Sequence, residues 1–227
     1  MADTNPAEGL GLVHLLRPSR AEAPEGQKPP LLALAHGVGS NEQDLFSFAE
    51  ELDPRFIVVS ARGPLTRAPG SYAWFNVQFL ANGDFAIAPE QLDSSRQTYA
   101  AFVRAAAEAY GADPARIYTL GFSQGAIISL VTALTDPKLF AGVIAMSGRI
   151  PPEAEPWLPS PDETAGLPVF QSHGTLDTVI GIEHAHRARA ILERQRVDLS
   201  YHEYRAVHTI NQPMFDDMTA WLAARLG

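Results

Sequence analysis

The segment GFSQG, residues 121–125, contains the side chain best placed for covalent chemistry, Ser123. It follows an apolar run and precedes a helical pattern, so the serine falls on a strand-to-helix turn. In so tight a turn the positions two before and two after the serine must be small, and glycine occupies both. The pattern predicts a serine nucleophile presented at the edge of a sheet. The structural alternative is an ordinary turn with glycines for packing.

A serine hydroxyl is a weak nucleophile unless a base takes its proton, so a histidine and a carboxylate must lie beside it. His208 comes just beyond the last predicted strand, whereas His202 falls inside that strand and is expected to be structural. Asp177 follows the predicted strand 167–174, at the edge where the third group belongs. We therefore expect Ser123 as nucleophile, His208 as base and Asp177 as the acid that orients the base.

Other titratable residues have less suitable positions. His173 lies at a strand end and is expected to be packed and hydrogen-bonded. His184 and His186 are two apart on a predicted helix, so they face different directions and do not form a metal pair. No metal site is predicted. The competing carboxylates lie in a Pro-rich loop, before a strand or on the last helix: Asp162, Asp198, Asp216 and Asp217.

Negative charge on a substrate carbonyl oxygen requires backbone N–H donors aimed at it. The amide of Gln124, directly after the serine, is one expected donor. The second is expected from HGVGSN, residues 36–41, where two glycines let the loop pass close to the nucleophile. We nominate the amide of Val38.

Buried apolar runs alternate with helical periodicities along the chain, which predicts a mostly parallel central sheet with helices on both faces. A length of 227 residues fits one α/β domain, 1–227. Chemistry in such sheets collects at the carboxyl ends of the strands. The predicted strands are 31–37, 56–64, 116–122, 141–148, 167–174 and 199–206, and the predicted helices begin near 41, 94, 127, 182 and 214.

Two segments interrupt the alternation: residues 65–93, and residues 149–168, of which six are proline. Each segment begins at the carboxyl end of a predicted strand, so both are expected to shape a pocket. In the first, Trp74, Phe75 and Phe79 are expected to form the hydrophobic wall that binds substrate. The alternative is that these aromatic residues plug the core beneath a loop.

The composition excludes several function classes. The net charge of −9, from 17 basic and 26 acidic residues with no basic block, argues against a nucleic-acid partner. The absence of cysteine excludes disulfides and a thiolate nucleophile. Neither a signal-peptide pattern nor an apolar stretch of membrane-spanning length is present, so we expect a cytoplasmic protein without stable membrane insertion. Two lysines beside 15 arginines suggest a GC-rich bacterial source.

Taken in order, a set of short motifs resembles the phospholipase/carboxylesterase family of α/β-hydrolases, which includes small bacterial carboxylesterases and acyl-protein thioesterases. The motifs are HGVGSNEQDL, ARGP, AWF, GFSQGA, AMSGRIP, HGTLDTVI and a late histidine before a helix. The resemblance spans nearly the whole chain from about residue 11. One departure is Val207, which stands before the histidine where the family often has glycine.

The resemblance implies an α/β-hydrolase fold without a large cap, a small-molecule ester substrate of short to medium acyl chain, and no metal or organic cofactor. Carried over by position, the triad is Ser123, Asp177 and His208, and the oxyanion amides are those of Val38 and Gln124. A homodimer is compatible with the family. Two alternatives are an acyl-protein thioesterase or lysophospholipase-type hydrolase, and a non-catalytic ligand-binding protein on the same fold.

Overall fold

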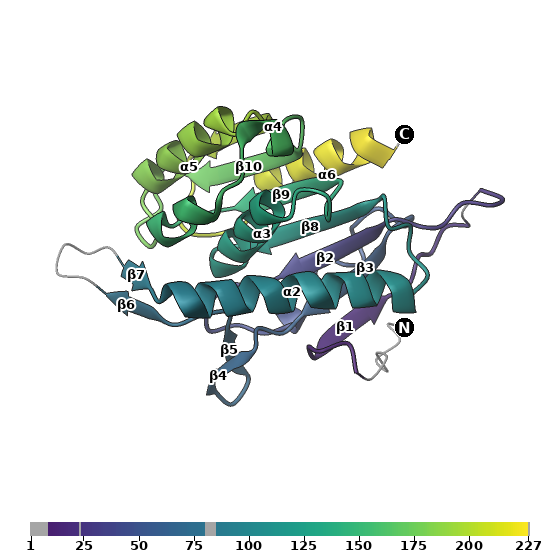
Figure 1. Ribbon diagram of the computed structural model, residues 1–227. Coiled ribbons are helices and arrows are strands. Elements are labelled where there is room, and N and C mark those ends of the chain that lie inside the picture. Colours follow the sequence, from purple (N-terminus) through teal and green to yellow (C-terminus); the bar gives the residue numbers. More distant parts are fainter. Residues whose placement is uncertain (1–8, 23, 80–84, 227) are drawn as a thin grey trace.

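The computed structural model describes residues 9–22, 24–79 and 85–226, and its centre is a seven-stranded sheet in the order β1-β3-β2-β8-β9-β10-β11 (Figure 1). The strands from β3 to β11 pair in parallel, and only β1 runs antiparallel, against β3. The sheet strands are β1 His14–Arg17, β2 Leu31–Ala35, β3 Ile57–Ala61, β8 Ile117–Phe122, β9 Gly142–Met146, β10 Pro168–Gly174 and β11 Asp198–Tyr204. The predicted α/β class with a mostly parallel sheet is confirmed.

The inner strands are the continuous apolar runs of the sequence. Every residue of β2, β3 and β9 is buried, as parallel strands covered on both faces require. The edge strand β11 is only half-buried along most of its length. This difference explains why the inner strands have the clearer sequence signal.

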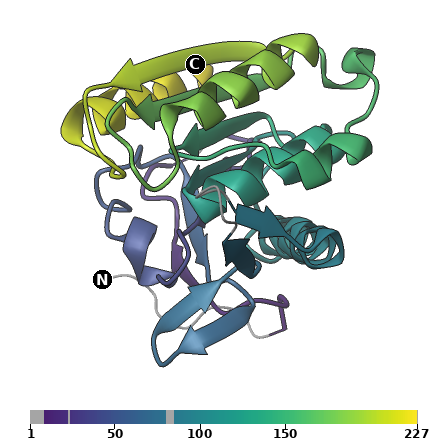
Figure 2. The same ribbon diagram turned by 90° about the vertical axis from the view of Figure 1, so that its left-hand side faces the viewer.

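Helices cover both faces of the sheet (Figure 2). The helices α2, α3 and α5 contribute to one hydrophobic cluster, and α1 and α6 contribute to the other. The helices are α1 Gln43–Phe46, α2 Pro89–Ala109, α3 Gln124–Thr135, α4 Pro161–Thr164, α5 Ile182–Arg194 and α6 Gln212–Leu226, with a 3₁₀ helix at Pro152–Trp157. Two small hairpins, β4–β5 (Leu65–Ala68 with Ser71–Ala73) and β6–β7 (Val77–Phe79 with Phe85–Ile87), complete the elements.

Two helix boundaries differ from the sequence prediction. Helix α2 begins at Pro89 and not near Ser94, because proline at the first helical turn has the required φ and lacks an N–H that would go unpaired there. Helix α1 ends at Phe46, whereas the apolar spacing predicted a helix to Leu52. The N-cap of α1 is Glu42 and not Asn41, and its side chain makes no capping hydrogen bond. The side chain of Asn41 accepts a hydrogen bond from the amide of Gln43, 2.9 Å away, in a local turn before the helix.

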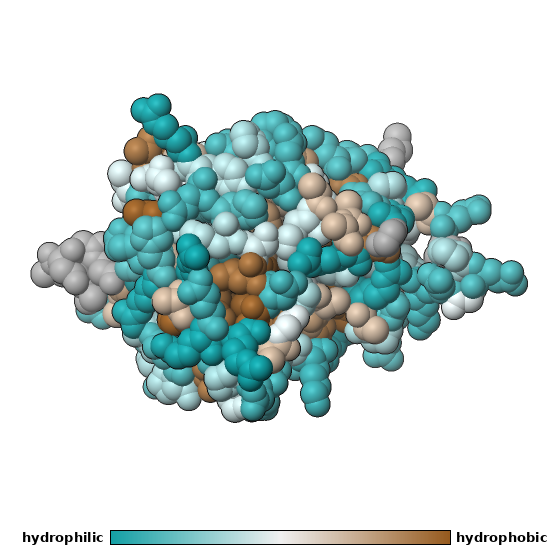
Figure 3. Space-filling view, turned by 90° about the horizontal axis from the view of Figure 1, so that it is seen from above, coloured by the Kyte–Doolittle hydropathy of each residue, from teal (hydrophilic) through white to brown (hydrophobic). Residues whose placement is uncertain are grey.

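The face seen from above α5 and α6 is mostly hydrophilic, with hydrophobic residues gathered in a few small patches (Figure 3). None of the helices in the described residues is both long enough and apolar enough to span a bilayer.

Candidate active site

The predicted chemistry-bearing residues follow the carboxyl ends of neighbouring strands. Ser123 follows β8, Asp177 follows β10, and His208 follows β11. The chain leaves β2 toward β3 on one side and leaves β8 toward β9 on the other, so the connections diverge between β2 and β8. Ligands of open parallel sheets bind at such a divergence, and Ser123 lies there.

The tight turn at Ser123 explains why glycine occupies positions 121 and 125 of the motif. The serine has φ 55° and ψ −118°, a conformation rare for a residue with a side chain. A Cβ on Gly121 would lie 2.2 Å from the carbonyl oxygen of Gly125, and a Cβ on Gly125 would lie 1.8 Å from that of Ala35. Helix α3 therefore packs directly against the backbone of β2, which leaves the serine at the end of the sheet. Such strain at a functional position is typical of a pre-organised nucleophile.

Ser123, His208 and Asp177 form a continuous chain of hydrogen bonds. The Oγ of Ser123 is 2.9 Å from Nε2 of His208, and Nδ1 of His208 is 2.6 Å from Oδ2 of Asp177. The Asp177 side chain is fully buried, whereas that of His208 keeps 16% of its surface exposed. The ring of Phe122 packs against the imidazole of His208, with the two ring centroids 4.9 Å apart.

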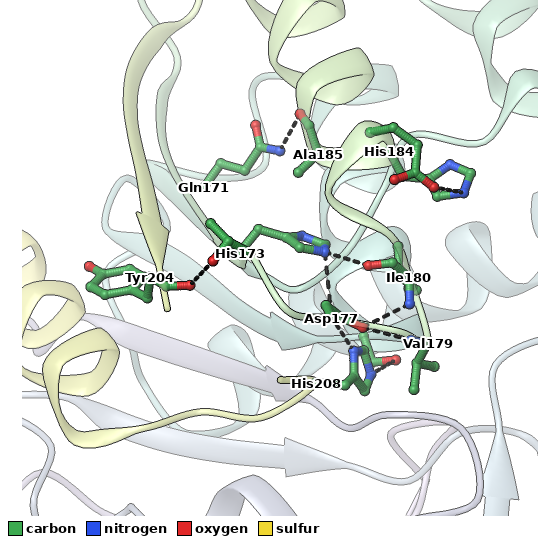
Figure 4. Close-up of polar contacts among 12 residues, drawn as sticks. Gln171, His173, Asp177, Val179, Ile180, His184, Ala185, Tyr204 and His208 are labelled. Atoms are coloured by element: carbon green, nitrogen blue, oxygen red, sulfur yellow. Dashed lines mark hydrogen bonds and ion pairs between the residues drawn. The ribbon is translucent and has the colours of Figure 1, made fainter. Parts of the chain in front are cut away.

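The other carboxylate oxygen of Asp177 is anchored by its own loop (Figure 4). Its Oδ1 accepts hydrogen bonds from the amides of Val179, at 2.8 Å, and Ile180, at 2.9 Å. An aspartate that accepts from amides two and three positions ahead forms a local turn. Because both oxygens have donors, the carboxylate orientation is fixed without solvent.

His173, the residue expected to be packed, is a buried neutral imidazole beside Asp177 (Figure 4). Its Nε2 donates to the carbonyl of Ile180 at 2.8 Å and lies 3.4 Å from Oδ2 of Asp177. Its Nδ1 has no hydrogen-bond partner among the described residues. Burial lowers the pKa of His173, so the ring carries its single proton on Nε2 and holds the loop that carries the aspartate.

Val38 and Gln124 line the same cavity as Ser123. In the loop after β2 the amide of Gly39 donates to Tyr72 and that of Ser40 to Gly37. Across the part of the chain that the structure describes, the amides of Val38 and Gln124 have no such acceptor. Both N–H groups are therefore available to a ligand at the nucleophile.

The structure places the three aromatic residues that were expected to form the hydrophobic wall of the substrate site in different surroundings. Phe75 lines the cavity beside Ser123, together with Val77, Phe85, Ile127, Val179 and Ile180. Trp74 does not: its side chain is fully buried, and its indole N–H donates to the carbonyl of His36 at 3.0 Å. The expectation for Trp74 is thus corrected to a core residue, because this buried acceptor draws the indole inward. The side chain of Phe79 lies outside the described residues.

A role of the Gln124 side chain was missed in the sequence. Its Oε1 accepts from the amide of Trp74 and its Nε2 donates to the carbonyl of Phe75, both at 2.8 Å. Gln124 therefore clamps the segment that carries Phe75 over the cavity. A long-range contact of this kind leaves no local pattern, but a polar residue at the first, buried turn of an apolar helix is a signal of such pairing.

Three buried histidines predict an acid-sensitive fold. Burial lowers the pKa values of His14, His36 and His173 below the ordinary 6.5. Below pH 6.5 the unfolded chain therefore binds more protons than the folded one, and the free energy of unfolding must fall as pH decreases. Each histidine adds at most about 1.4 kcal/mol per pH unit to this slope.

Urea unfolding between pH 7.5 and 5 measures this slope. Glu42 and Asp53, whose pKa values their arginine partners lower, contribute only at more acidic pH, so this window isolates the histidines. A free energy of unfolding that does not change from pH 7.5 to 5 would show that these rings protonate freely in the folded state.

A parallel sheet covered by helices on both faces, with a serine on a strained turn after a central strand, defines the α/β-hydrolase class. Residues 18–226 match the Phospholipase/Carboxylesterase family, and the chain belongs to that family. It is an enzyme that hydrolyses ester bonds, as its relatives' names also indicate.

The relatives include esterases and thioesterases. Esterase YpfH of Escherichia coli is 30% identical over 175 residues, which cover 75% of this chain and 72% of the relative. Acyl-protein thioesterase 1 of Kluyveromyces lactis is 27% identical over 211 residues, which cover 86% and 92%. The crystal structure of the Bacillus cereus carboxylesterase superposes with a TM-score of 0.78 at 25% identity, covering 94% of each chain.

Proposed function

We propose that this protein is a serine carboxylesterase that hydrolyses short- to medium-chain esters with Ser123 as nucleophile, His208 as base and Asp177 as the orienting acid. The observation that carries the proposal is the hydrogen-bonded chain from Ser123 Oγ through the imidazole to the buried Asp177 carboxylate. A neutral imidazole so held presents Nε2 unprotonated to the serine hydroxyl.

The reaction proceeds in two halves. Oγ of Ser123 attacks the carbonyl carbon while its proton passes to Nε2 of His208; the imidazolium then gives that proton to the leaving oxygen as the carbon–oxygen bond breaks. Water, deprotonated by the same nitrogen, releases the acid from the acyl-enzyme. Asp177 stabilises the charged imidazole in both halves.

The amides of Val38 and Gln124 are proposed to bind the oxyanion of each tetrahedral intermediate. Both belong to residues that line the cavity at Ser123, and neither N–H has a protein acceptor in the described part of the chain. Gln124 is also the first residue of α3, so the positive end of the helix dipole favours negative charge at this point.

The cavity beside Ser123 is proposed to hold the acyl chain. Its buried end is formed by Phe75, Ile127 and Ile180, all apolar, and its volume is about 80 Å³. An apolar cavity of about 150 Å³ holds a six-carbon ring, so a cavity of this size holds about three carbons. This size favours an acyl chain near butyrate.

A series of p-nitrophenyl esters from acetate to laurate tests the proposal. We expect kcat/KM to rise from acetate to a maximum near butyrate, because each methylene buried in the cavity contributes about 0.8 kcal/mol. It should fall about tenfold or more by laurate, because the buried end of the cavity stops a long chain from entering with its carbonyl carbon at Ser123. In Val77→Phe, which fills the cavity from β6, the maximum should move to acetate.

The matched control is Val13→Phe, at an exposed valine just before β1. It should leave the profile unchanged. Equal values for all acyl lengths in the wild type would contradict an acyl-binding cavity, and inactivity on every ester would contradict the proposed function.

Thioester hydrolysis is the second candidate, favoured by the similarity to Acyl-protein thioesterase 1. Esters and thioesters share the acyl-enzyme route, so only a comparison of kcat/KM for an ester and a thioester with the same acyl group separates them. The cytoplasmic location, the bacterial source and the homodimer stay predictions from the sequence.

A further inference from the structure

Exposed apolar side chains concentrate at one place on this protein. Among the residues that the structure describes, five large hydrophobic side chains are exposed: Val13, Val38, Leu176, Val179 and Val207. Val13 precedes β1 and does not line the cavity at Ser123. Val38 and Val179 line the cavity at Ser123, while Leu176 and Val207 directly precede the aspartate and the histidine in the chain. Such a concentration on a soluble surface marks a binding site.

Two of these residues, Leu176 and Val207, do not line the cavity and form what we call the apolar platform. Its two loops are in contact: the amide of Leu176 donates to the carbonyl of Ala206 at 3.0 Å, and a Cβ on Gly174 would lie 2.7 Å from the carbonyl oxygen of Val207. Figure 4 shows Val179 beside Asp177 and His208. Leu176 and Val207 are 49% and 58% exposed, so the platform faces solvent beside the imidazole.

The chemistry of the proposed function determines what must lie over this platform. The leaving oxygen receives its proton from Nε2 of His208, so during acylation it must be within about 3 Å of that nitrogen. The acyl chain occupies the cavity lined by Phe75 and Ile127. The substituent on the leaving oxygen therefore extends away from this cavity, over Leu176 and Val207, which directly precede Asp177 and His208.

We infer that the apolar platform binds the leaving group and that the preferred substrates are esters of apolar alcohols, with alkyl or aryl leaving groups. This inference rests on the proposed function and deepens it. During acylation the Ser123 Oγ–carbon bond forms, the carbon–leaving oxygen bond breaks, and the proton that Ser123 lost to His208 goes to the departing alkoxide, giving the alcohol. The platform contacts the substrate only until this alcohol departs.

The test varies the alcohol at constant acyl group. Methyl butyrate and hexyl butyrate, each below its solubility limit, are hydrolysed by the wild type, by Leu176→Ser/Val207→Ser and by Val13→Ser. The measured quantity is the ratio of kcat/KM for the hexyl ester to that for the methyl ester. Because kcat/KM reports on all steps up to and including acylation, it is sensitive to the contact between the protein and the leaving group.

We expect a wild-type ratio of about ten or more, a decrease of about tenfold in the double variant through loss of apolar contact, and no change in Val13→Ser. Val207→Leu, which enlarges the platform, should raise the ratio. Since all three positions are exposed, the serine variants should retain the wild-type circular dichroism and melting temperature.

Equal ratios in the double variant and in Val13→Ser would overturn the inference while leaving the proposed function intact. If the double variant lost the same factor of kcat/KM on the methyl and the hexyl ester, the inference would also be overturned. Such a result would mean that Leu176 and Val207 act on the triad and not on the leaving group. A changed elution volume on size exclusion with an unchanged ratio would assign the platform to contact between copies of the chain. Inactivity of the wild type on both esters would instead count against the proposed function.

Discussion

Ser123→Ala should lose essentially all esterase activity, with kcat reduced by about 10⁶-fold, as removal of the nucleophile does in serine hydrolases. The variant should fold normally, because within the described residues the Ser123 hydroxyl bonds to no side chain except that of His208. Activity on p-nitrophenyl butyrate and thermal melting by circular dichroism measure the two effects.

Ser147→Ala is the matched control. Ser147 is also a buried serine with positive φ at a strand end, here after β9, and its hydroxyl has no hydrogen-bond partner within the described ranges. It should retain full activity. Substantial turnover by Ser123→Ala, or loss of activity in Ser147→Ala alone, would mean that the nucleophile has been assigned to the wrong residue.

Asp177→Asn should reduce kcat by about 10⁴-fold with little change in the fold. The amide keeps the size of the carboxylate, and its oxygen can still accept from the amides of Val179 and Ile180. Its NH₂ group then faces Nδ1 of His208, so Nδ1 must accept a hydrogen bond and the ring proton moves to Nε2. A protonated Nε2 cannot accept the proton of Ser123. Steady-state kinetics on p-nitrophenyl butyrate give the size of this effect.

Asp198→Asn is the control for this variant, since Asp198 lies at the opposite end of the sheet and pairs with Arg225 at the surface. We expect wild-type kcat and KM. If Asp177→Asn were as active as Asp198→Asn, the orienting carboxylate would have to be another residue.

The positions of the three proposed triad residues could be predicted because each is encoded locally. Ser123, Asp177 and His208 each follow a run of residues that reads as a strand, and parallel strands bring their carboxyl ends to one edge. The hydrogen bonds between the three side chains depend on the register of β8, β10 and β11, which the sequence pattern does not specify.

Features that depend on distant partners were missed or misassigned. Strand β1, with the sequence HLLR, has no clear alternation and exists because β3 offers it an edge. Trp74 was expected at the substrate, but its position is decided by the carbonyl of His36, 38 residues away. The Gln124 clamp likewise spans about 50 residues of chain.

The most direct test of the central claim is covalent labelling by an alkyl fluorophosphonate, followed by mass spectrometry of the digested protein. We predict one adduct per chain, located on the peptide that carries Ser123, and no adduct in Ser123→Ala. An adduct on a different residue, or full labelling of the Ser123→Ala variant, would contradict the assignment of Ser123 as the nucleophile.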